Sequence, residues 1–179
     1  MIRAVLTAAA RRLAAFSDSP RLDAELLLGH VLARTRAQLL THDDESLPAN
    51  LQSSYEALLE RRCQGEPVAY LLGFRDFWKH RFIVGPGVLV PRPDTELLVE
   101  LALQWLDGMP NPRVLDLGAG SGAIGLSVAL DHPGALVTLT DRSPEALNIS
   151  RRNCEELGAT AEIVEGLWFD AVENRKFDL

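Results

Sequence analysis

The sequence predicts an α/β protein in which a small helical bundle precedes a β-hairpin and a parallel sheet. Residues 1–73 carry repeated helical patterns and little strand character, whereas residues 113–165 alternate between short apolar strands and amphipathic helices. Between them, aromatic and β-branched residues become frequent from Phe74 onward. We therefore divide the chain into a helical domain, a hairpin connector and a sheet domain, at 1–73, 74–90 and 91–179.

Composition narrows the class of protein. The chain has 179 residues, of which 47% are hydrophobic and 24% charged, as in ordinary globular proteins. A net charge of -7 argues against a broad grip on nucleic acid phosphates, and no apolar run approaches the roughly 20 residues that span a bilayer. Cys63 and Cys154 lie in no metal-binding pattern. We expect a cytoplasmic protein that contacts neither membrane nor nucleic acid directly, and we predict no metal site.

Residues typical of helix N-termini indicate where the helices of the first part begin. Ser19 is placed to cap a helix that begins at Pro20, where a missing N–H costs nothing. Thr35 and Gln38 have the spacing of a capping box, and a longer helix is predicted over 48–64. After the hairpin, one apolar helix is expected to turn five residues toward the sheet: Leu97, Leu98, Leu101, Trp105 and Leu106.

The alternating region predicts two β-α-β crossovers, and therefore parallel strands with helices on both faces. The expected strands are 113–117, 136–140 and 161–165, and the expected helices are 122–131 and 144–156. The first strand runs into a glycine-rich loop and then a helix, in the stretch RVLDLGAGSGAIGLSVAL. Such a loop lets a ligand approach the backbone closely, which indicates a cofactor site.

Two cofactor classes fit the loop. Gly120, Gly122 and Gly125 satisfy the dinucleotide pattern G-x-G-x-x-G, and Asp141 closes the next strand where a ribose acid is expected. An NAD-binding oxidoreductase domain is therefore one interpretation. Asp116, in LDLG, favours the other, because a carboxylate at the mouth of the loop would repel a pyrophosphate and attract the sulfonium and ammonium of S-adenosylmethionine. In both, Asp141 can accept hydrogen bonds from the ribose hydroxyls.

Simpler structural roles exist for the same residues. Asp116 could cap the loop, and Asp141 could form an Asx turn before Ser143. Trp168, in GLWFD, is by default a core or rim residue. A non-enzymatic interaction module, in which the helical part binds a partner, is a third interpretation of the whole chain.

Five segments resemble the HemK/PrmC family: SPRLDAELLL, RRCQGEPVAYLLGFRDFW, LVPRPDTELLVE, VLDLGAGSGAIGLSVA and LTDRSPEAL. The resemblance implies a Rossmann-like class I methyltransferase domain that uses S-adenosylmethionine to methylate the glutamine side-chain nitrogen of the GGQ motif in class 1 peptide chain release factors. It also implies a helical domain that helps to dock the release factor. By the resemblance, Asp141 holds the ribose, Trp168 lies by the adenine, and the methionine part is lined by Gly118, Ala119, Gly120, Ser121 and Gly122.

The sequence departs from the family at two places. Leu167 stands where the family usually has an acid, which puts an adenine contact from that side chain in doubt. The family's strand after KFDL continues into an Asn-Pro-Pro-Tyr motif that binds the substrate amide, and residues 1–179 do not include it. We therefore expect an incomplete sheet with an open edge at strand 113–117, a fragment of a longer protein, no catalytic residue within the chain, and no activity of this chain alone.

Overall fold

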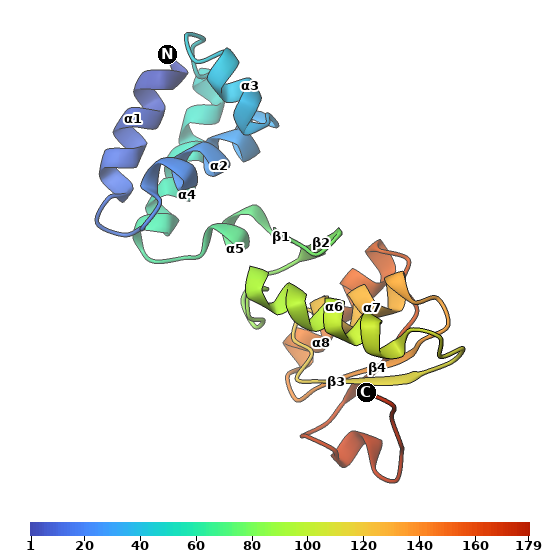
Figure 1. The fold of residues 1–179 in the computed structure, drawn as a ribbon. Coiled ribbons are helices and arrows are strands. Elements are labelled where there is room, and N and C mark those ends of the chain that lie inside the picture. Colours follow the sequence, from blue (N-terminus) through green and yellow to red (C-terminus); the bar gives the residue numbers. More distant parts are fainter. The chain divides into compact units, whose positions relative to one another are not determined.

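The computed structural model describes residues 1–179, which form two compact units, Met1–Leu72 and Gly73–Leu179 (Figure 1). Each unit has its own cluster of buried apolar side chains. In neither unit does a helix combine the length and the hydropathy needed to cross a lipid bilayer. Both units therefore have what an independent domain requires, an apolar core of their own.

Five helices make up the first unit: α1 (Ile2–Leu13), α2 (Pro20–Leu32), α3 (Arg36–Thr41), α4 (Ala49–Cys63) and α5 (Val68–Leu72). Helix α2 packs against each of the other four and is the centre of the bundle. The largest fully buried side chains of this core include Leu6, Leu13, Leu27, Leu28, Tyr55 and Leu59. The predicted helical bundle is confirmed.

Of the two capped helix N-termini predicted in the first unit, one is confirmed in full and the other only in its position. The capping box is confirmed: the Thr35 hydroxyl accepts from the Gln38 amide at 3.2 Å, and the Gln38 side chain accepts from the Thr35 amide at 2.8 Å. Helix α2 begins at Pro20 as predicted, but Ser19 caps no backbone amide. Its hydroxyl is directed instead to the Asp23 carboxylate, at 3.4 Å.

Two acids of α2, Asp23 and Glu25, are buried and paired with arginines. Arg62 of α4 donates to Asp23 at 2.8 Å, while Glu25 accepts from Arg21 at 2.7 Å and from Arg36 at 2.8 Å. Burial by itself raises the pKa of Glu25, but the hydrogen bonds and positive charges of the two arginines outweigh it and hold the pKa below its ordinary 4.5. These pairs connect α2 to α3 and α4.

Glu25 is expected to make the helical unit acid-sensitive. Because its pKa is lower in the folded than in the unfolded chain, it stabilises the fold above pH 4.5, and this contribution disappears as the pH falls through the folded value. Urea unfolding followed by circular dichroism measures this. Glu25→Gln should unfold at lower urea than the wild type at about pH 7, and the difference should shrink as the pH falls below 4.5. Glu60→Gln, which neutralises an exposed acid of α4, is the control. Equal pH slopes for Glu25→Gln and wild type would contradict the expectation.

The second unit begins with an antiparallel hairpin of β1 (Phe74–Phe77) and β2 (His80–Ile83). Phe77 and Phe82 are buried in the same core as the sheet that follows. At the turn, the Trp78 indole donates to Asp131 at 2.7 Å and the Trp78 amide donates to Glu96 at 3.0 Å. The hairpin is therefore packed and hydrogen-bonded as part of this unit.

Helix α6 (Glu96–Leu106) follows a 3-10 turn at Pro93–Thr95. The expectation for its inner face is wrong apart from Leu106, because half or more of each of four side chains is exposed: Leu97, Leu98, Leu101 and Trp105. The buried residues are Val99, Ala102 and Leu106. Because the helix is apolar almost all round, periodicity could not identify which face is buried. Contact with the rest of the unit decides that face.

The parallel sheet matches the predicted alternation. It contains β3 (Arg113–Leu117), β4 (Leu136–Asp141) and β5 (Glu162–Glu165), with α7 (Ala123–Asp131) and α8 (Pro144–Glu156) as crossovers. The strand order is β3-β4-β5 and both pairings are parallel. The predicted fold class is confirmed.

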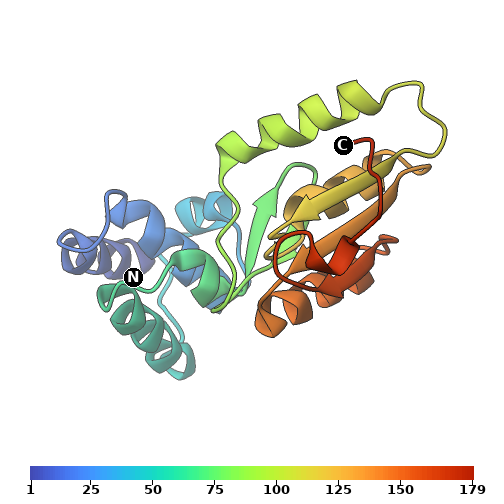
Figure 2. The same cartoon turned by 90° about the horizontal axis from the view of Figure 1, so that it is seen from below.

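Helices α7 and α8 lie on the same face of the sheet, with α6 packed against α7 (Figures 1 and 2). The expectation of helices on both faces is therefore wrong for residues 1–179. Each new strand lies beside the one before it, in the order β3-β4-β5. Because both crossovers are right-handed and move across the sheet in the same direction, their helices lie on the same face. The segment after β5 lies on the other side of the sheet (Figure 1).

Strand β3 is at the edge of the sheet, but its edge is partly covered. The amide of Asp178 donates to the Arg113 carbonyl at 2.8 Å, and the Leu115 amide donates to the Leu179 carbonyl at 2.9 Å. The expectation of an open edge is wrong for these residues of β3, because residues 178 and 179 run beside them and satisfy their backbone groups.

Candidate functional site

The loop from β3 to α7 is held by backbone hydrogen bonds in a conformation that needs glycine. The amides of Gly118 and Ala119 both donate to the Thr140 carbonyl, at 2.8 and 2.9 Å. Gly118 and Gly120 have φ of +72° and +57°, a region costly for other residues, and a Cβ on either would meet nothing within 4 Å. Backbone conformation therefore requires these two glycines, and open space lies beside them for a ligand.

Close packing requires Gly125 and adds to the need for glycine at Gly122, whose φ is +78°. A Cβ on Gly125 would lie 2.3 Å from the Leu139 side chain, and one on Gly122 would lie 2.9 Å from Leu126 and 3.2 Å from Leu139. Leu139 and Leu126 are fully buried. These two glycines let α7 pack closely against β4, which is also the task of the third glycine in dinucleotide-binding loops.

The side chain of Asp141, at the end of β4, is hydrogen-bonded to the glycine loop. One carboxylate oxygen accepts from the Gly120 amide and the other from the Ser143 amide, each at 2.9 Å. The second bond is the Asx-type contact that the structural interpretation predicted, so that interpretation is confirmed. A carboxylate oxygen can accept more than one hydrogen bond, and each oxygen of Asp141 keeps capacity for a hydroxyl donor.

A pocket of about 390 Å³ opens beside Asp141. We call it the Asp141 pocket; it is lined by Leu117, Gly118, Thr140, Asp141, Arg142, Gly166, Leu167 and Trp168. Of the predicted cofactor residues, Gly118, Asp141 and Trp168 line it. The remaining loop residues, Ala119, Gly120, Ser121 and Gly122, continue from Gly118 toward α7 and are not part of its lining.

Trp168 lies on the wall of the Asp141 pocket with 72% of its surface exposed. Its φ of +52° is unusual for a residue other than glycine and holds the backbone in a left-handed conformation. Leu167, next to it, is 49% exposed and offers the pocket only apolar surface. An exposed indole beside a polar carboxylate is suited to cover the flat face of a heterocycle.

Asp116 is not in this pocket. Its carboxylate accepts from the Gly125 amide at 2.9 Å and lines a separate hollow of about 420 Å³ beside α6, with Leu98 and Trp105. Burial raises the pKa of Asp116, and the negative charge of Asp141 raises it further, against the opposing effect of the Gly125 amide. Asp116 thus accepts a hydrogen bond from the first turn of α7 rather than from the loop that it was predicted to cap, and its predicted role toward a cofactor stays a prediction.

Four residues that line the Asp141 pocket were not predicted from the sequence: Leu117, Thr140, Arg142 and Gly166. Thr140 acts through its backbone carbonyl, which any residue could provide, so no sequence signal marks it. The amide of Gly166 donates to the Asp141 carbonyl at 3.0 Å, and a Cβ there would lie 2.3 Å from Ala171. A glycine directly after a predicted strand was the available signal.

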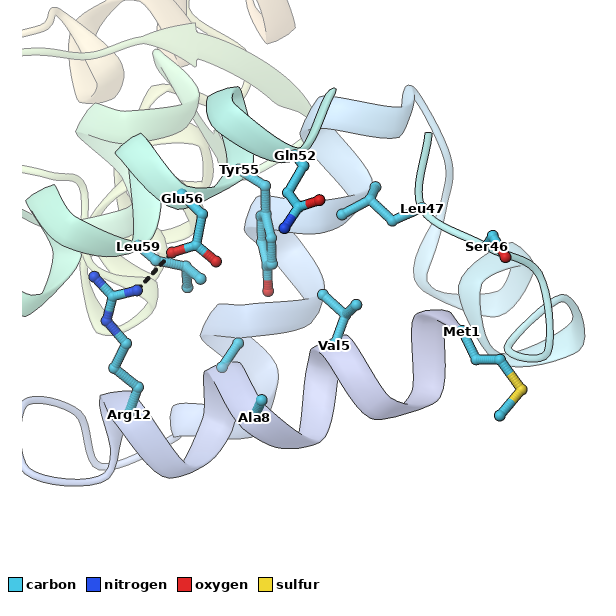
Figure 3. Close-up of a pocket in the computed structure, with 11 residues that line it drawn as sticks. Met1, Val5, Ala8, Arg12, Ser46, Leu47, Gln52, Tyr55, Glu56 and Leu59 are labelled. Carbon is cyan, nitrogen blue, oxygen red and sulfur yellow. Dashed lines mark hydrogen bonds and ion pairs between the residues drawn. The ribbon is translucent and has the colours of Figure 1, made fainter. Parts of the chain in front are cut away.

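The helical unit contains its own pocket, of about 370 Å³, between α1 and α4 (Figure 3). We call it the α1–α4 pocket. Tyr55 and Gln52 extend into it from α4 and Val5 from α1, and the Arg12–Glu56 ion pair, at 2.6 Å, closes one end (Figure 3). The α1–α4 pocket thus has apolar side chains in its lining and the charged Arg12–Glu56 pair at its rim.

Comparison with known proteins agrees with this arrangement. The model of the methyltransferase small domain matches residues 93–179, and the model of the PrmC N-terminal domain matches residues 4–73. The glycine loop, the acid after the second strand and the parallel sheet thus lie in the part of the chain that matches a methyltransferase domain. The chain is therefore similar to the PrmC N-terminal domain and to the methyltransferase small domain, in this order.

The following three relatives share the name release factor glutamine methyltransferase. A release factor glutamine methyltransferase from Bordetella pertussis is 50% identical over 161 residues, which are 89% of this chain and 60% of that protein. One from Xylella fastidiosa is 46% identical over 98% of this chain and 62% of its own length. One from Escherichia coli is 43% identical over 90% of this chain and 58% of its own length. The chain therefore spans about 60% of the length of such relatives.

Proposed function

We propose that the protein to which this chain belongs methylates the side-chain amide nitrogen of the GGQ glutamine in class 1 release factors. The name shared by the relatives supports the reaction, and the Asp141 pocket, with its carboxylate and exposed indole, supports the cofactor. In this proposal residues 91–179 bind S-adenosylmethionine and residues 1–73 help to dock the release factor, with the hairpin of 74–90 as connector.

The bound cofactor would supply an electrophilic methyl group: the new bond joins carbon to the amide nitrogen, the sulfonium–carbon bond breaks, and the nitrogen loses one proton to water. An amide nitrogen is a weak nucleophile, so the rate depends on orientation, which can contribute about 7 to 11 kcal/mol in favourable cases. The residues of this chain serve the cofactor side: Asp141 accepts from the ribose hydroxyls, the backbone of Gly118 to Gly122 lines the methionine part, and Trp168 covers the adenine. We assign no catalytic residue within 1–179.

We further propose that the protein acts in the cytoplasm and contacts no nucleic acid directly. Both cysteines are free, as is usual for proteins of reducing compartments. The net charge of -7 gives no electrostatic attraction toward phosphates. The release factor would then be recognised as a protein surface, for which the α1–α4 pocket, with its apolar lining and charged rim, is one suitable contact.

Titration calorimetry with S-adenosylmethionine and NAD tests the cofactor. We expect the chain to bind S-adenosylmethionine and to give no heat with NAD. Tighter binding of NAD would establish the dinucleotide alternative, for which the glycine pattern and the position of Asp116 away from the Asp141 pocket are the arguments. Binding of neither would favour the non-enzymatic module.

The substrate is tested on the full-length protein, incubated with methyl-labelled S-adenosylmethionine and a class 1 release factor. Label is expected on the GGQ glutamine. A release factor in which that glutamine is replaced by alanine is the matched control and should take up no label. Equal labelling of both would overturn the substrate assignment while leaving the cofactor assignment intact.

A further inference from the structure

Two polar side chains of α8 are completely buried although neither lines the Asp141 pocket. Ser150 and Asn153 both have 0% exposure. They are three residues apart and so project from the same face of the helix. A buried hydroxyl and a buried amide destabilise a fold unless their hydrogen bonds are made, so the partners of these two groups reveal their role.

Both partners are carbonyl groups of the glycine loop. The Ser150 hydroxyl donates to the Gly120 carbonyl at 2.7 Å, and the Asn153 side-chain amide donates to the Ser121 carbonyl at 2.8 Å. The amide of Gly120 is meanwhile held by Asp141 at 2.9 Å. Gly120, at φ +57°, is thus fixed at both its N–H and its C=O, by side chains from two different elements.

Asn153 also binds the hairpin. Its side-chain nitrogen donates to the Ile83 carbonyl at 3.0 Å, and its side-chain oxygen accepts from the Ile83 amide at 2.6 Å. Both donors and the acceptor of one side chain are therefore used, two at the end of β2 and one at the loop. Trp78 fixes the other end of the hairpin to Asp131 at 2.7 Å. The hairpin is thereby rigidly attached next to the loop.

We propose that Ser150 and Asn153 are positioning residues that hold the Gly118–Gly122 loop in its ligand-binding conformation, and that through Asn153 the hairpin is part of this support. The inference rests on the proposed function for its ligand, S-adenosylmethionine. A loop with two open glycines has many backbone conformations available. Fixing the carbonyls of Gly120 and Ser121 selects one of them before the ligand arrives, which removes an entropic cost from binding.

Two variants test the proposal. Ser150→Ala removes one donor with little change in volume, and Asn153→Asp keeps the shape of the side chain while replacing its N–H donors by an acceptor that faces two carbonyl groups. Each should raise the Kd for S-adenosylmethionine in titration calorimetry on the order of tenfold or more. In the unliganded protein, the loop amides should exchange with deuterium faster than in the wild type. The matched control is Asn148→Asp, which makes the same chemical change on an exposed residue of α8 and should alter neither quantity.

The unfolding midpoint of each variant separates positioning from general stability. If the two residues only stabilise the fold, the midpoint falls while the Kd and loop exchange of the folded protein stay within twofold of wild type, and the proposal is overturned. Should Asn153→Asp not fold, the smaller Ser150→Ala change decides by the same criteria. A wild-type chain that binds no S-adenosylmethionine refutes the proposed function instead, and the inference with it.

Discussion

Replacement of Asp141 by alanine is expected to weaken binding of S-adenosylmethionine by at least about 100-fold. In the proposed complex the ribose hydroxyls donate two hydrogen bonds to this carboxylate, each worth about 1.5 to 3 kcal/mol, and the change removes both. It also leaves the amides of Gly120 and Ser143 without the carboxylate that they contact at 2.9 Å. The loop and the start of α8 therefore lose a common anchor together with the ligand contact.

Titration calorimetry measures this effect, with two further variants for comparison. Asp141→Asn keeps the shape and one acceptor oxygen, so its Kd should lie between those of wild type and Asp141→Ala. Asp107→Ala removes an equal charge from an exposed position after α6 and should bind as wild type does. A Kd for Asp141→Ala within threefold of wild type would show that the ligand binds elsewhere than in the Asp141 pocket.

Substitution of Gly125 by alanine is expected to destabilise the second unit, Gly73–Leu179, by about 1 to 3 kcal/mol. The added methyl would lie 2.3 Å from a terminal carbon of Leu139 and 3.1 Å from an oxygen of Asp116. Leu139 is fully buried in β4 and cannot move aside without displacing its neighbours. Helix α7 must therefore shift away from the sheet, which also strains the hydrogen bond from the Gly125 amide to Asp116.

Urea unfolding monitored by tryptophan fluorescence reports on this unit, because all three tryptophans lie in it. The control is Gly85→Ala, since a Cβ there would meet nothing within 4 Å. The control should unfold as wild type does. An unchanged free energy of unfolding for Gly125→Ala would mean that α7 and β4 are less closely packed than the structure has them.

The accuracy of the sequence interpretation differs between neighbouring residues. Asp141 was predicted as a site residue from its place at the end of a strand and Gly118 from the family resemblance, and the structure brings both to one pocket. Asp116 ends an adjacent strand by the same logic, yet its carboxylate turns to the Gly125 amide and another hollow. Position along a strand identifies the end of the sheet where a side chain lies, but not which neighbour the side chain meets.

Sequence alone was sufficient for features whose causes lie within a few residues of each other. The capping box of Thr35 and Gln38, the start of α8 at Ser143 and Pro144, and the alternation of strands and helices over 113–165 all follow from local hydrogen bonds and periodicity. The parallel pairing follows as well, because a helix between two strands returns the chain to the end of the sheet at which the first strand began. The resemblance of five segments also predicted the domains and the relatives that the comparisons find.

Only the tertiary structure decided the contacts between residues distant in sequence. The inner face of α6, the common face of α7 and α8, and the burial of Ser150 and Asn153 against the glycine loop all depend on which surfaces meet when the elements pack. Ile83 and Asn153 are 70 residues apart, and no local pattern connects them. The physical reason is that periodicity and caps report energies between near neighbours, whereas the partner of a buried polar group is determined by the arrangement of the whole core.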